Sequence, residues 1–300
     1  MSNHSGVKVY RTPTDHLYMV LVYSLSILFS VVILVPLIFV VAASFSSPDA
    51  LMAGRVFLWP VEFNIRGYTM VLEHKMLVTG FKNTLIYAGA GTVINVLLTI
   101  LAAYPLSRRD LKIRNPVMFL FAFTMLFSGG MIPLYLLVKD LKILNTRWAM
   151  LLPNAMTVWN VIITRTYFQS NIPDEMLESA NIDGCDDFRF LWKIALPLSV
   201  PIIAVNVLLY AVGHWNSYFN ALIYLNDNAL YPLQLVLRDI LIQDDTAGIS
   251  MDVTKQLEQQ RLRYLLQYST IVVATVPVAV LYPFVQKYFV SGIMVGAIKG

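Results

Sequence analysis

The chain has 300 residues, of which 57% are hydrophobic and 13% are charged, and its formal net charge is +4. Soluble domains contain about 45 to 50% apolar and about 25% charged residues, so this composition excludes a single soluble core and makes membrane lipid the expected solvent. The mild charge excludes a nucleic-acid-binding protein, and a single cysteine, Cys185, without any Cys/His cluster offers neither a metal site nor an intramolecular disulfide.

Six apolar stretches approach the roughly 20 residues that a helix needs to cross a ~30 Å hydrocarbon core. The first stretch follows Lys8 and Arg11, but it is much longer than the about 7 to 15 apolar residues of a signal peptide, so we expect a retained span. The sequence therefore predicts an all-α integral membrane protein with a six-span domain at 17–286. The spans are expected at about 17–43, 84–106, 116–138, 148–168, 198–225 and 264–286.

An even number of spans places both chain ends on one side of the membrane. Lys and Arg are equally divided between the two sides, but in the short loops they favour a cytoplasmic N-terminus. We therefore expect cytoplasmic tails at 1–16 and 287–300. The short-loop residues are Arg108, Arg109, Lys112 and Arg114 on the inside and Lys139, Lys142 and Arg147 on the outside.

The segment 172–197 predicts a short helix, a glycine turn and a second helix. Pro173 fits the first helical position, the acids that follow it favour the positive end of the helix dipole, and Gly184 fits a left-handed C-terminal stop. The second helix is expected to rest an apolar stripe on the bundle. This stripe consists of Phe188, Leu191 and Ile194 or Ala195.

The same segment is acidic within a basic chain. Between Tyr167 and Phe188 there are six acids and no Lys or Arg. Asp174 and Glu178 share a helix face, where unrelieved like charges destabilise the helix by a few tenths of a kcal/mol. A basic partner surface would remove that cost, and a solvated acidic loop is the alternative that charge alone leaves open.

The residue order of this segment resembles the EAA motif, E-A-A-x-x-D-G-A with a downstream I-x-L-P, of the integral membrane subunits of ABC importers. The match runs from Glu178 to Pro197, and Ser179 and Cys185 stand where alanine is usual. The stretch Gly213-His214-Trp215-Asn216 and the tail 286–300 look like the maltose-type carbohydrate importers. The resemblance therefore covers nearly the whole chain, and it is least specific at 45–82 and 240–263.

The resemblance implies a type I ABC importer permease fold with a cytoplasmic helix-turn-helix coupling element at 172–197. In that family the element sits in a cleft of an ATPase subunit, so that ATP-driven closure of the ATPase pair rocks the membrane helices between inward- and outward-facing states. It also implies cytoplasmic chain ends, because the motif must lie in the cytoplasm. The implied coupling residues are Glu175, Glu178, Ser179, Ala180, Asp183, Gly184 and Cys185.

As the resemblance implies, the chain is a transmembrane subunit in the bacterial cytoplasmic membrane that translocates a saccharide, expected to be an oligosaccharide. The implied partners are a second permease subunit in a heterodimer, two cytoplasmic ATPase subunits and an extracytoplasmic solute-binding protein. The sequence holds no Gly-x-x-x-x-Gly-Lys-Ser/Thr, so the chain is not expected to bind ATP through a P-loop of its own. No cofactor is expected on this chain, and ATP and Mg belong to the partner subunits.

Polar residues in the fifth span recur every three or four positions, which places them on one helix face. Because polar groups in a membrane helix face a bundle interior or a water-filled path, and because amides and aromatic rings suit a neutral sugar, this face predicts a substrate path. Interhelical hydrogen bonds worth ~0.6 kcal/mol each are the alternative. The substrate-path candidates are Asn206, Tyr210, Trp215, Asn216, Ser217 and Asn220, with Asn154 and Asn160 from the fourth span.

Other interpretations stay open at several points. The importer could carry a non-sugar solute, and a secondary carrier would explain the spans but not the acidic element. An intramembrane enzyme is disfavoured, since the sequence has no HExxH, no Gly-x-Ser-x-Gly and no second cysteine for Cys185. The segment 226–263 fits a linker or a docking segment equally well, and His214 fits a hydrogen-bonding spacer better than a proton switch.

Overall fold

The computed structural model describes residues 13–242 and 253–297. Every regular element within these two ranges is a helix, which confirms the all-α fold class. Contacts divide the chain into two compact units, 1–70 with 250–272 and 71–249 with 273–300, and each is described by itself. Residues 1–12 of the predicted N-terminal tail, 298–300 of the C-terminal tail and 243–252 of the segment 226–263 lie outside the described residues.

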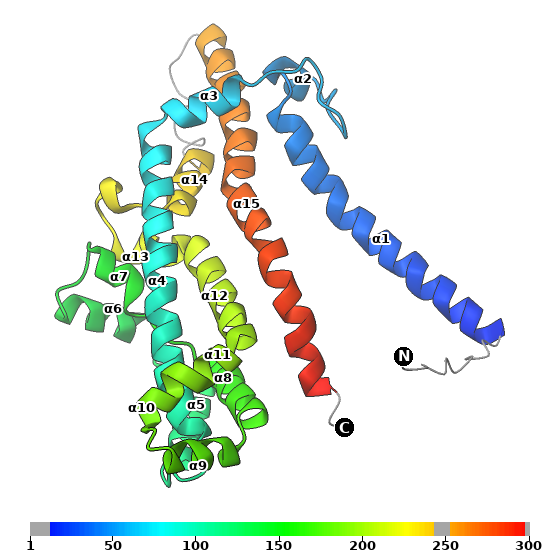
Figure 1. Cartoon of the computed structure of the whole chain (residues 1–300). Helices are drawn as coiled ribbons and strands as arrows, with labels where there is room; N and C mark the ends of the chain where they lie inside the picture. Colours follow the sequence, from blue (N-terminus) through cyan, green and yellow to red (C-terminus); the bar gives the residue numbers. More distant parts are fainter. Residues whose placement is uncertain (1–12, 243–252, 298–300) are drawn as a thin grey trace. The chain divides into compact units, whose positions relative to one another are not determined.

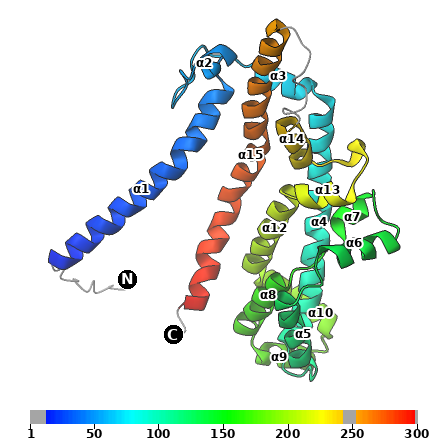
Figure 2. The ribbon, with the colours of Figure 1, turned by 180° about the vertical axis from the view of Figure 1, so that it is seen from behind.

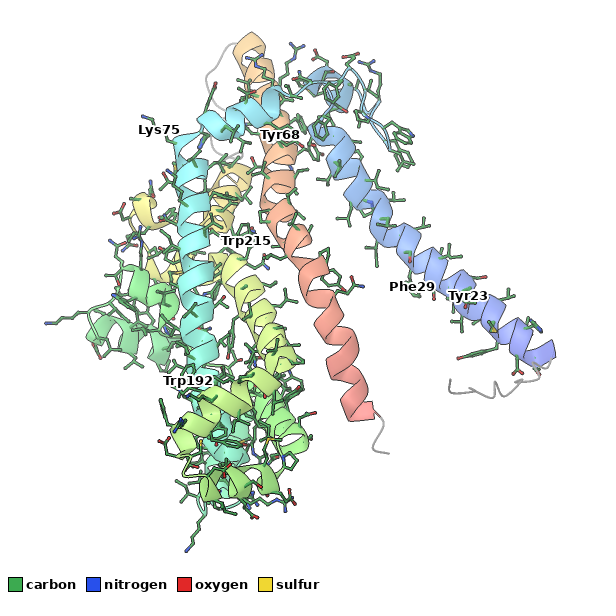
Figure 3. All side chains as sticks on the ribbon, in the orientation of Figure 1. Tyr23, Phe29, Tyr68, Lys75, Trp192 and Trp215 are labelled. Carbon is green, nitrogen blue, oxygen red and sulfur yellow. The ribbon has the colours of Figure 1, made fainter. Side chains whose placement is uncertain are left out.

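The first unit consists mainly of a long apolar helix and a short connecting region. The span Thr14–Ser44 has a mean hydropathy of 3.0 and only 6% of its most apolar window is buried, so its side chains, such as Tyr23 and Phe29, point outward (Figure 3). An exposed apolar helix of this length suits lipid or a partner chain. Its elements are α1 (Pro13–Ser44), α2 (Pro48–Met52), the start of α3 (Arg66–Glu73) and the first part of α15 (Val253–Ala297).

A local hydrogen-bond network orders the loop that follows α2. Ser47 caps α2 by accepting from the backbone N–H of Ala50, and its hydroxyl donates to Glu62. Arg55 pairs with the other carboxylate oxygen of Glu62 at 2.7 Å. The hydrogen bonds from Ser47 and Arg55 lower the pKa of Glu62 below its ordinary value, so this carboxylate stays charged in more acidic solution than a free glutamate does.

The second unit is built around α4, the long cyan helix of Figures 1 and 2. Helices α8, α12 and α14 all pack against α4, and α12 also contacts α8. The elements of this unit, besides the second part of α15, are α4 (Lys75–Ser107), α5 (Arg114–Leu126), α6 (Met131–Asp140), α7 (Arg147–Leu151), α8 (Val158–Asn171), α9 (Asp174–Ile182), α10 (Asp187–Phe190), the π-helix η1 (Leu191–Ala195), α11 (Leu196–Leu198), α12 (Val200–Trp215), α13 (Tyr218–Tyr224), η2 (Asn228–Leu230) and α14 (Leu233–Ile242).

The predicted spans differ in continuity. Among the described residues, three helices are long and apolar enough to cross a membrane, or up to five if each of two bent helix pairs forms one span. The three long helices include the expected spans 17–43, 84–106 and most of 264–286. The last of them belongs to α15, which already begins at Val253, before the expected span. The expected tail from 287 to Ala297 also belongs to α15 and is helical.

The other three predicted spans are interrupted at residues that break helices. The expected span 116–138 is bent by 113° between α5 and α6, where Gly130 has a φ of 84° that other residues rarely adopt. The expected span 148–168 is divided into α7 and α8 around Pro153, and α8 has only 14 residues. In the expected span 198–225 the chain bends by 83° before α12, which then ends at Trp215.

A row of polar side chains on α4 binds backbone groups in the short η2 segment, at the start of α14 and at the break before α8. Asn83 donates from Nδ2 to the carbonyls of Ala229 and Tyr231, at 2.7 and 3.1 Å. Further along the helix, Asn95 donates to the carbonyl of Asn154 at 3.1 Å, in the break between α7 and α8. Asn154 lies in the expected span 148–168, and non-helical backbone is tolerated at membrane depth only where the protein satisfies its polar groups. The bond from Asn95 therefore explains how the break between α7 and α8 is accommodated.

Thr84 provides a test of this row, because its hydroxyl accepts from the buried backbone N–H of Leu233 at 2.8 Å. Substitution Thr84→Val keeps the shape and leaves that N–H unpaired, which costs about 1 to 3 kcal/mol. We expect the apparent Tm of the purified protein to fall by several degrees, measured by thermal unfolding in one detergent.

The matched control is Thr92→Val on the same helix. The hydroxyl of Thr92 is buried and has no hydrogen-bond partner among the described residues. Its replacement by a methyl group should leave the Tm unchanged or raise it. Equal losses in both variants would contradict the role assigned to the α4 hydrogen bonds.

Candidate functional site

The predicted helix-turn-helix is present and ends its first helix as expected. Gly184 has a φ of 75° and terminates α9 in a left-handed conformation. The N–H of Gly184 donates to the carbonyl of Asn181, and the N–H of Cys185 donates to that of Ala180, the bond pair of a Schellman motif. Asp186 then caps α10 by accepting from the N–H of Arg189 at 2.7 Å. Asp186, one of the six acids, thus stabilises the start of the second helix.

The element rests on the bundle through a buried base, which includes Leu191 and Ala195 of the expected stripe but not Phe188. Leu177, Ala180 and Phe190 belong to the same hydrophobic cluster as Tyr104 of α4 and Phe168 of α8. The second helix also buries Leu191 and Ala195 in this cluster. The prediction that Phe188 rests on the bundle was wrong, because its side chain is 64% exposed. A π-helical turn follows at η1, so the three- and four-residue spacing of a regular α-helix does not hold there.

One face of α9 remains exposed, and we name it the coupling face: Glu175, Glu178, Ser179 and Ile182. These residues are three, four and seven positions apart, so they line one side of the helix. Ile182 is 87% exposed, which is unusual for a large apolar side chain next to well-packed neighbours. Of the other predicted coupling residues, Asp183 and Gly184 are exposed beside this face, Cys185 is half-buried and Ala180 is part of the base. Their coupling role stays a prediction.

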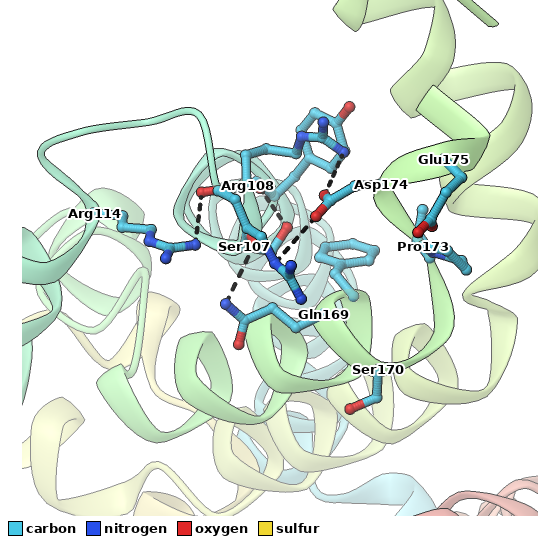
Figure 4. A pocket seen from close by; sticks show the side chains of 12 residues that line it. Ser107, Arg108, Arg114, Gln169, Ser170, Pro173, Asp174 and Glu175 are labelled. Atoms are coloured by element: carbon cyan, nitrogen blue, oxygen red, sulfur yellow. Dashed lines mark hydrogen bonds and ion pairs between the residues drawn. The ribbon is translucent and has the colours of Figure 1, made fainter. Parts of the chain in front are cut away.

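Asp174 ties the element to the end of α4. Its carboxylate lies 3.1 Å from Nε of Arg109 and 3.7 Å from Nη1 of Arg108 (Figure 4). The like-charge cost expected between Asp174 and Glu178 is therefore relieved in part by arginines of the same chain, which come from a distant part of the sequence. Asp174 is therefore paired within the chain, whereas Glu175 and Glu178 of the coupling face form no ion pair with the described residues.

The same end of α4 is capped by donors from α8. Arg165 donates from Nε to the carbonyl of Leu106 at 2.8 Å, and Gln169 donates to the carbonyl of Ser107 at 3.3 Å. Cationic donors at the C-terminal end of a helix are favoured by its dipole. These contacts surround a polar cavity of about 450 Å³ between α4, α8 and the start of α9. The coupling element and the end of α4 are thereby joined by apolar packing and ion pairs, and α8 caps the same end of α4.

A second cavity, of about 310 Å³, lies within the bundle, and we name it the membrane cavity. It is formed where α4, α7, α8, α12 and α13 meet. Its walls carry amides, hydroxyls and the rings of Trp159, Tyr210 and His214. Among its described lining residues there is no Lys, Arg, Asp or Glu. The lining residues are Asn95, Met150, Asn154, Thr157, Trp159, Asn160, Leu209, Tyr210, Gly213, His214, Ser217 and Asn220.

The membrane cavity collects five of the eight substrate-path candidates: Asn154, Asn160, Tyr210, Ser217 and Asn220. The other three lie elsewhere. Asn206 is buried and donates to Thr164 of α8 at 2.7 Å, as the alternative of interhelical bonding expects. Trp215 donates to the carbonyl of Ala274 at 3.0 Å. Asn216 is exposed and donates to the carbonyl of Val212.

The predicted stripe is therefore not continuous along one helix. The Asn216 amide bonds the carbonyl four residues back, a bond that competes with further helical turns, and the helix ends there. Tyr224, four positions after Asn220 and therefore at the same spacing, is buried with Val138 and Ala149. Tyr210, Ser217 and Asn220 still meet the fourth-span amides in the membrane cavity.

The sequence reasoning missed Trp159 as a member of this site. Its ring is 59% exposed and lines the membrane cavity beside Asn160. An aromatic residue directly before a membrane-helix amide was a usable signal, since rings and amides together suit sugars. In the described part of the chain no group of three or more His, Cys, Asp or Glu could hold a metal ion.

Comparison with known proteins gives one family over almost the whole length. Residues 5–295 match the family described as binding-protein-dependent transport system inner membrane component. The chain is 40% identical over 287 residues to the polygalacturonan/rhamnogalacturonan transport system permease protein YtcP of Bacillus subtilis, covering 95% of this chain and 99% of that protein. It is 41% identical over 270 residues to protein LplC of the same organism, covering 89% and 90%.

A solved structure has the same fold. It belongs to a bacterial ABC transporter involved in the import of the acidic polysaccharide alginate, and the superposition gives a TM-score of 0.84. The sequences are 33% identical, and the match covers 93% of this chain and 99% of the other. At this identity and coverage, the likeness extends over nearly the whole chain.

The ion pair of Asp174 generates a prediction about the mobility of α9. Substitution Asp174→Asn removes the charge held by Arg108 and Arg109, and partly exposed pairs of this kind contribute at most about 1 kcal/mol. We expect hydrogen exchange of the backbone at 174–184 to become about two- to fivefold faster, measured by mass spectrometry.

Substitution Glu178→Gln is the control, because it removes an exposed charge one turn away that makes no ion pair among the described residues. Exchange at 174–184 should then stay at the wild-type rate. An Asp174→Asn protein with unchanged exchange would show that the arginine contacts do not hold the element.

Proposed function

The chain belongs to the family of binding-protein-dependent transport system inner membrane components, and from this premise we propose that it is the membrane subunit through which an ATP-driven importer takes up an oligosaccharide. ABC transporter permeases of this family work with separate ATP-hydrolysing subunits. The observation that carries the proposal is the coupling face, an exposed acidic and apolar surface on a base that is packed firmly against α4.

The coupling face has the features of a docking surface for an ATPase subunit. Glu175 and Glu178 offer negative charge to a basic cleft, and Ile182 offers an exposed apolar side chain whose hydration is unfavourable. Interfaces of this kind combine a central apolar anchor with a charged rim that fixes orientation. Because the base is joined to α4 by packing and ion pairs, a movement imposed on the face is passed to the bundle.

Docking of an ATPase subunit on the coupling face implies the membrane topology of the chain and the other subunits of the complex. Residues 172–197 face the cytoplasm, so both chain ends are cytoplasmic and the membrane is the bacterial cytoplasmic membrane. The complex contains a second permease subunit, two ATPase subunits that bind ATP and Mg, and an extracytoplasmic binding protein that delivers the solute. The exposed apolar helix α1 gives the chain a surface for lipid or for the second permease.

A saccharide cargo is supported by two independent observations. The relatives that the chain resembles are permeases for polygalacturonan/rhamnogalacturonan and for arabinooligosaccharides, and the structural neighbour imports alginate. The membrane cavity carries amides, hydroxyls and rings without a fixed charge on its described lining residues, a chemistry that serves hydroxyl-rich solutes. A non-sugar importer would share the coupling face but has no support from these relatives.

The proposal is tested with the assembled complex in liposomes, supplied with its binding protein and with raffinose, trigalacturonate or a tripeptide. We expect one or both saccharides, and not the peptide, to stimulate ATP hydrolysis and to be taken up. In the same assay Glu178→Arg should reduce uptake at least about tenfold, because like charges brought together across an interface cost several kcal/mol. The complex should still assemble.

Substitution Asp140→Arg provides the matched control, since it reverses an exposed acid on α6, outside the coupling element. Its uptake should stay within about twofold of wild type. Stimulation by the peptide alone would overturn the saccharide class, whereas full uptake in Glu178→Arg would overturn the role of the coupling face.

A further inference from the structure

The polar cavity at the end of α4 contains an arginine with unused hydrogen-bond donors. Arg108 lies 3.6 Å from Asp110 and 3.7 Å from Asp174, which is longer than the about 2.7 to 3.2 Å of an N–H···O hydrogen bond. Its side chain is only 14% exposed. Because a guanidinium has five N–H donors and polar groups with little access to water are normally hydrogen-bonded, Arg108 is suited to an additional acceptor.

Arg114 adds a second cation to the same wall. It donates from Nη1 to the carbonyl of Arg108 at 3.3 Å (Figure 4) and forms no ion pair with the described residues. Asp174, the half-buried acid of the cavity, already lies 3.1 Å from Arg109. The cavity therefore favours an anion with several acceptor oxygens, and arginine binds phosphate oxygens through parallel N–H donors. Its charged lining residues are Arg108, Arg109, Arg114, Asp174 and Glu175.

The polar cavity lies at the end of a membrane span. Helix α4 is long and apolar enough to cross a membrane, and its expected span 84–106 ends directly before Ser107, which lines the cavity. Lipid phosphates lie at this depth, and basic pockets between membrane helices bind anionic head groups. The volume of about 450 Å³ is ordinary for a ligand pocket and accommodates a phosphate with a small polar head group.

A third cavity, of about 370 Å³, shares Tyr104 and Arg108 with the polar cavity, and we name it the apolar cavity. It extends from Leu101, inside the expected span, to Phe188, whose side chain is 64% exposed. A soluble phosphate needs no such surface, whereas the glycerol backbone and acyl chains of a lipid do. The residues that line it are Leu101, Tyr104, Pro105, Arg108, Asp110, Leu111, Asp187, Phe188 and Leu191.

We propose that the polar cavity binds the phosphate of an anionic phospholipid, with Arg108 and Arg114 as donors, while the apolar cavity receives the glycerol and the first acyl carbons of the same lipid. The site goes beyond the importer function, since it is independent of the solute and requires only that α4 crosses the membrane. Arg109 stays with Asp174, so the lipid adds a contact where α4 meets the coupling element and does not replace the ion pair.

Substitution Arg114→Gln tests the site without removing a partner of Asp174. The purified full-length chain, freed of lipid in detergent, is titrated with phosphatidylglycerol or phosphatidylcholine, and bound lipid is counted by native mass spectrometry. We expect wild type to bind one phosphatidylglycerol at least about tenfold more tightly than phosphatidylcholine, whose choline brings a positive charge close to the arginines. Arg114→Gln should weaken binding of phosphatidylglycerol about five- to tenfold, as loss of a charge-assisted hydrogen bond does.

The matched control is Lys112→Gln, which removes the same charge two residues away. Lys112 is exposed and lines neither the polar nor the apolar cavity. Its replacement should leave the affinity for phosphatidylglycerol within about twofold of wild type, because exposed charges contribute little. Equal losses in the two variants would show attraction by the basic surface as a whole and overturn the site.

Arg114→Lys keeps the charge and tests the guanidinium, also where the glutamine variant does not fold. Lysine is a point charge and cannot offer two parallel N–H donors to a phosphate. We expect an affinity for phosphatidylglycerol between those of wild type and Arg114→Gln. Wild-type affinity in Arg114→Lys would overturn the assignment of this guanidinium as a phosphate donor.

Glycerol 3-phosphate distinguishes a lipid from a soluble phosphate, because it carries the phosphate without acyl chains. At a concentration equal to that of phosphatidylglycerol it should displace less than about a tenth of the bound lipid, since it lacks the apolar contact. Displacement of half the lipid or more would identify a site for a soluble phosphate and overturn the lipid assignment. Binding is measured without transport, so its failure leaves the importer function standing, and failure of saccharide uptake leaves the lipid site standing.

Discussion

Hydrogen bonds between the side chains of α4 and the backbone of irregular segments are the constraint on which the permease unit depends. In a bilayer no water is available to satisfy an interrupted helix, so a break within a span must be satisfied by another part of the protein. Asn95 does this for the break before α8, and Asn83 and Thr84 hold the backbone at 229–233, beyond the end of the expected fifth span. One helix thereby supports the irregular segments around it and places the membrane cavity among them.

The same helix connects the two functional regions. At its C-terminal end, Arg108 and the following Arg109 bind Asp174 of the coupling element, while Tyr104 packs in the cluster that buries the base of that element. Further toward its N-terminus, Asn95 and Gly91 face α12 and the membrane cavity. In the proposed importer, force applied to the coupling face reaches the cavity through α4 and its contacts with α8 and α12. In that importer the coupling face supplies charge and one apolar anchor for docking, while the buried base holds the element rigidly against the bundle.

The sequence predicted those features that local chemistry decides. Gly184 gave the helix stop because only a residue that tolerates positive φ fits that turn, and the length of apolar runs located α1, α4 and α15. What it did not predict depends on partners far away in the chain. The pairing of Asp174 with two arginines, the exposure of Phe188 after a π-helical turn, and the burial of Asn206 against Thr164 all follow from tertiary contacts. Spacing found the amides of the membrane cavity, but it could not separate those that face the cavity from those that join helices.

In the proposed importer an ATPase subunit covers the coupling face. The decisive test is the reaction rate of a thiol at position 182 with a maleimide, in a chain carrying Ile182→Cys and Cys185→Ser, before and after the ATPase subunits are added. Ile182 is 87% exposed in the isolated chain, so we expect fast labelling that slows at least about tenfold when the complex assembles. An unchanged rate in a complex that contains the ATPase subunits would contradict it.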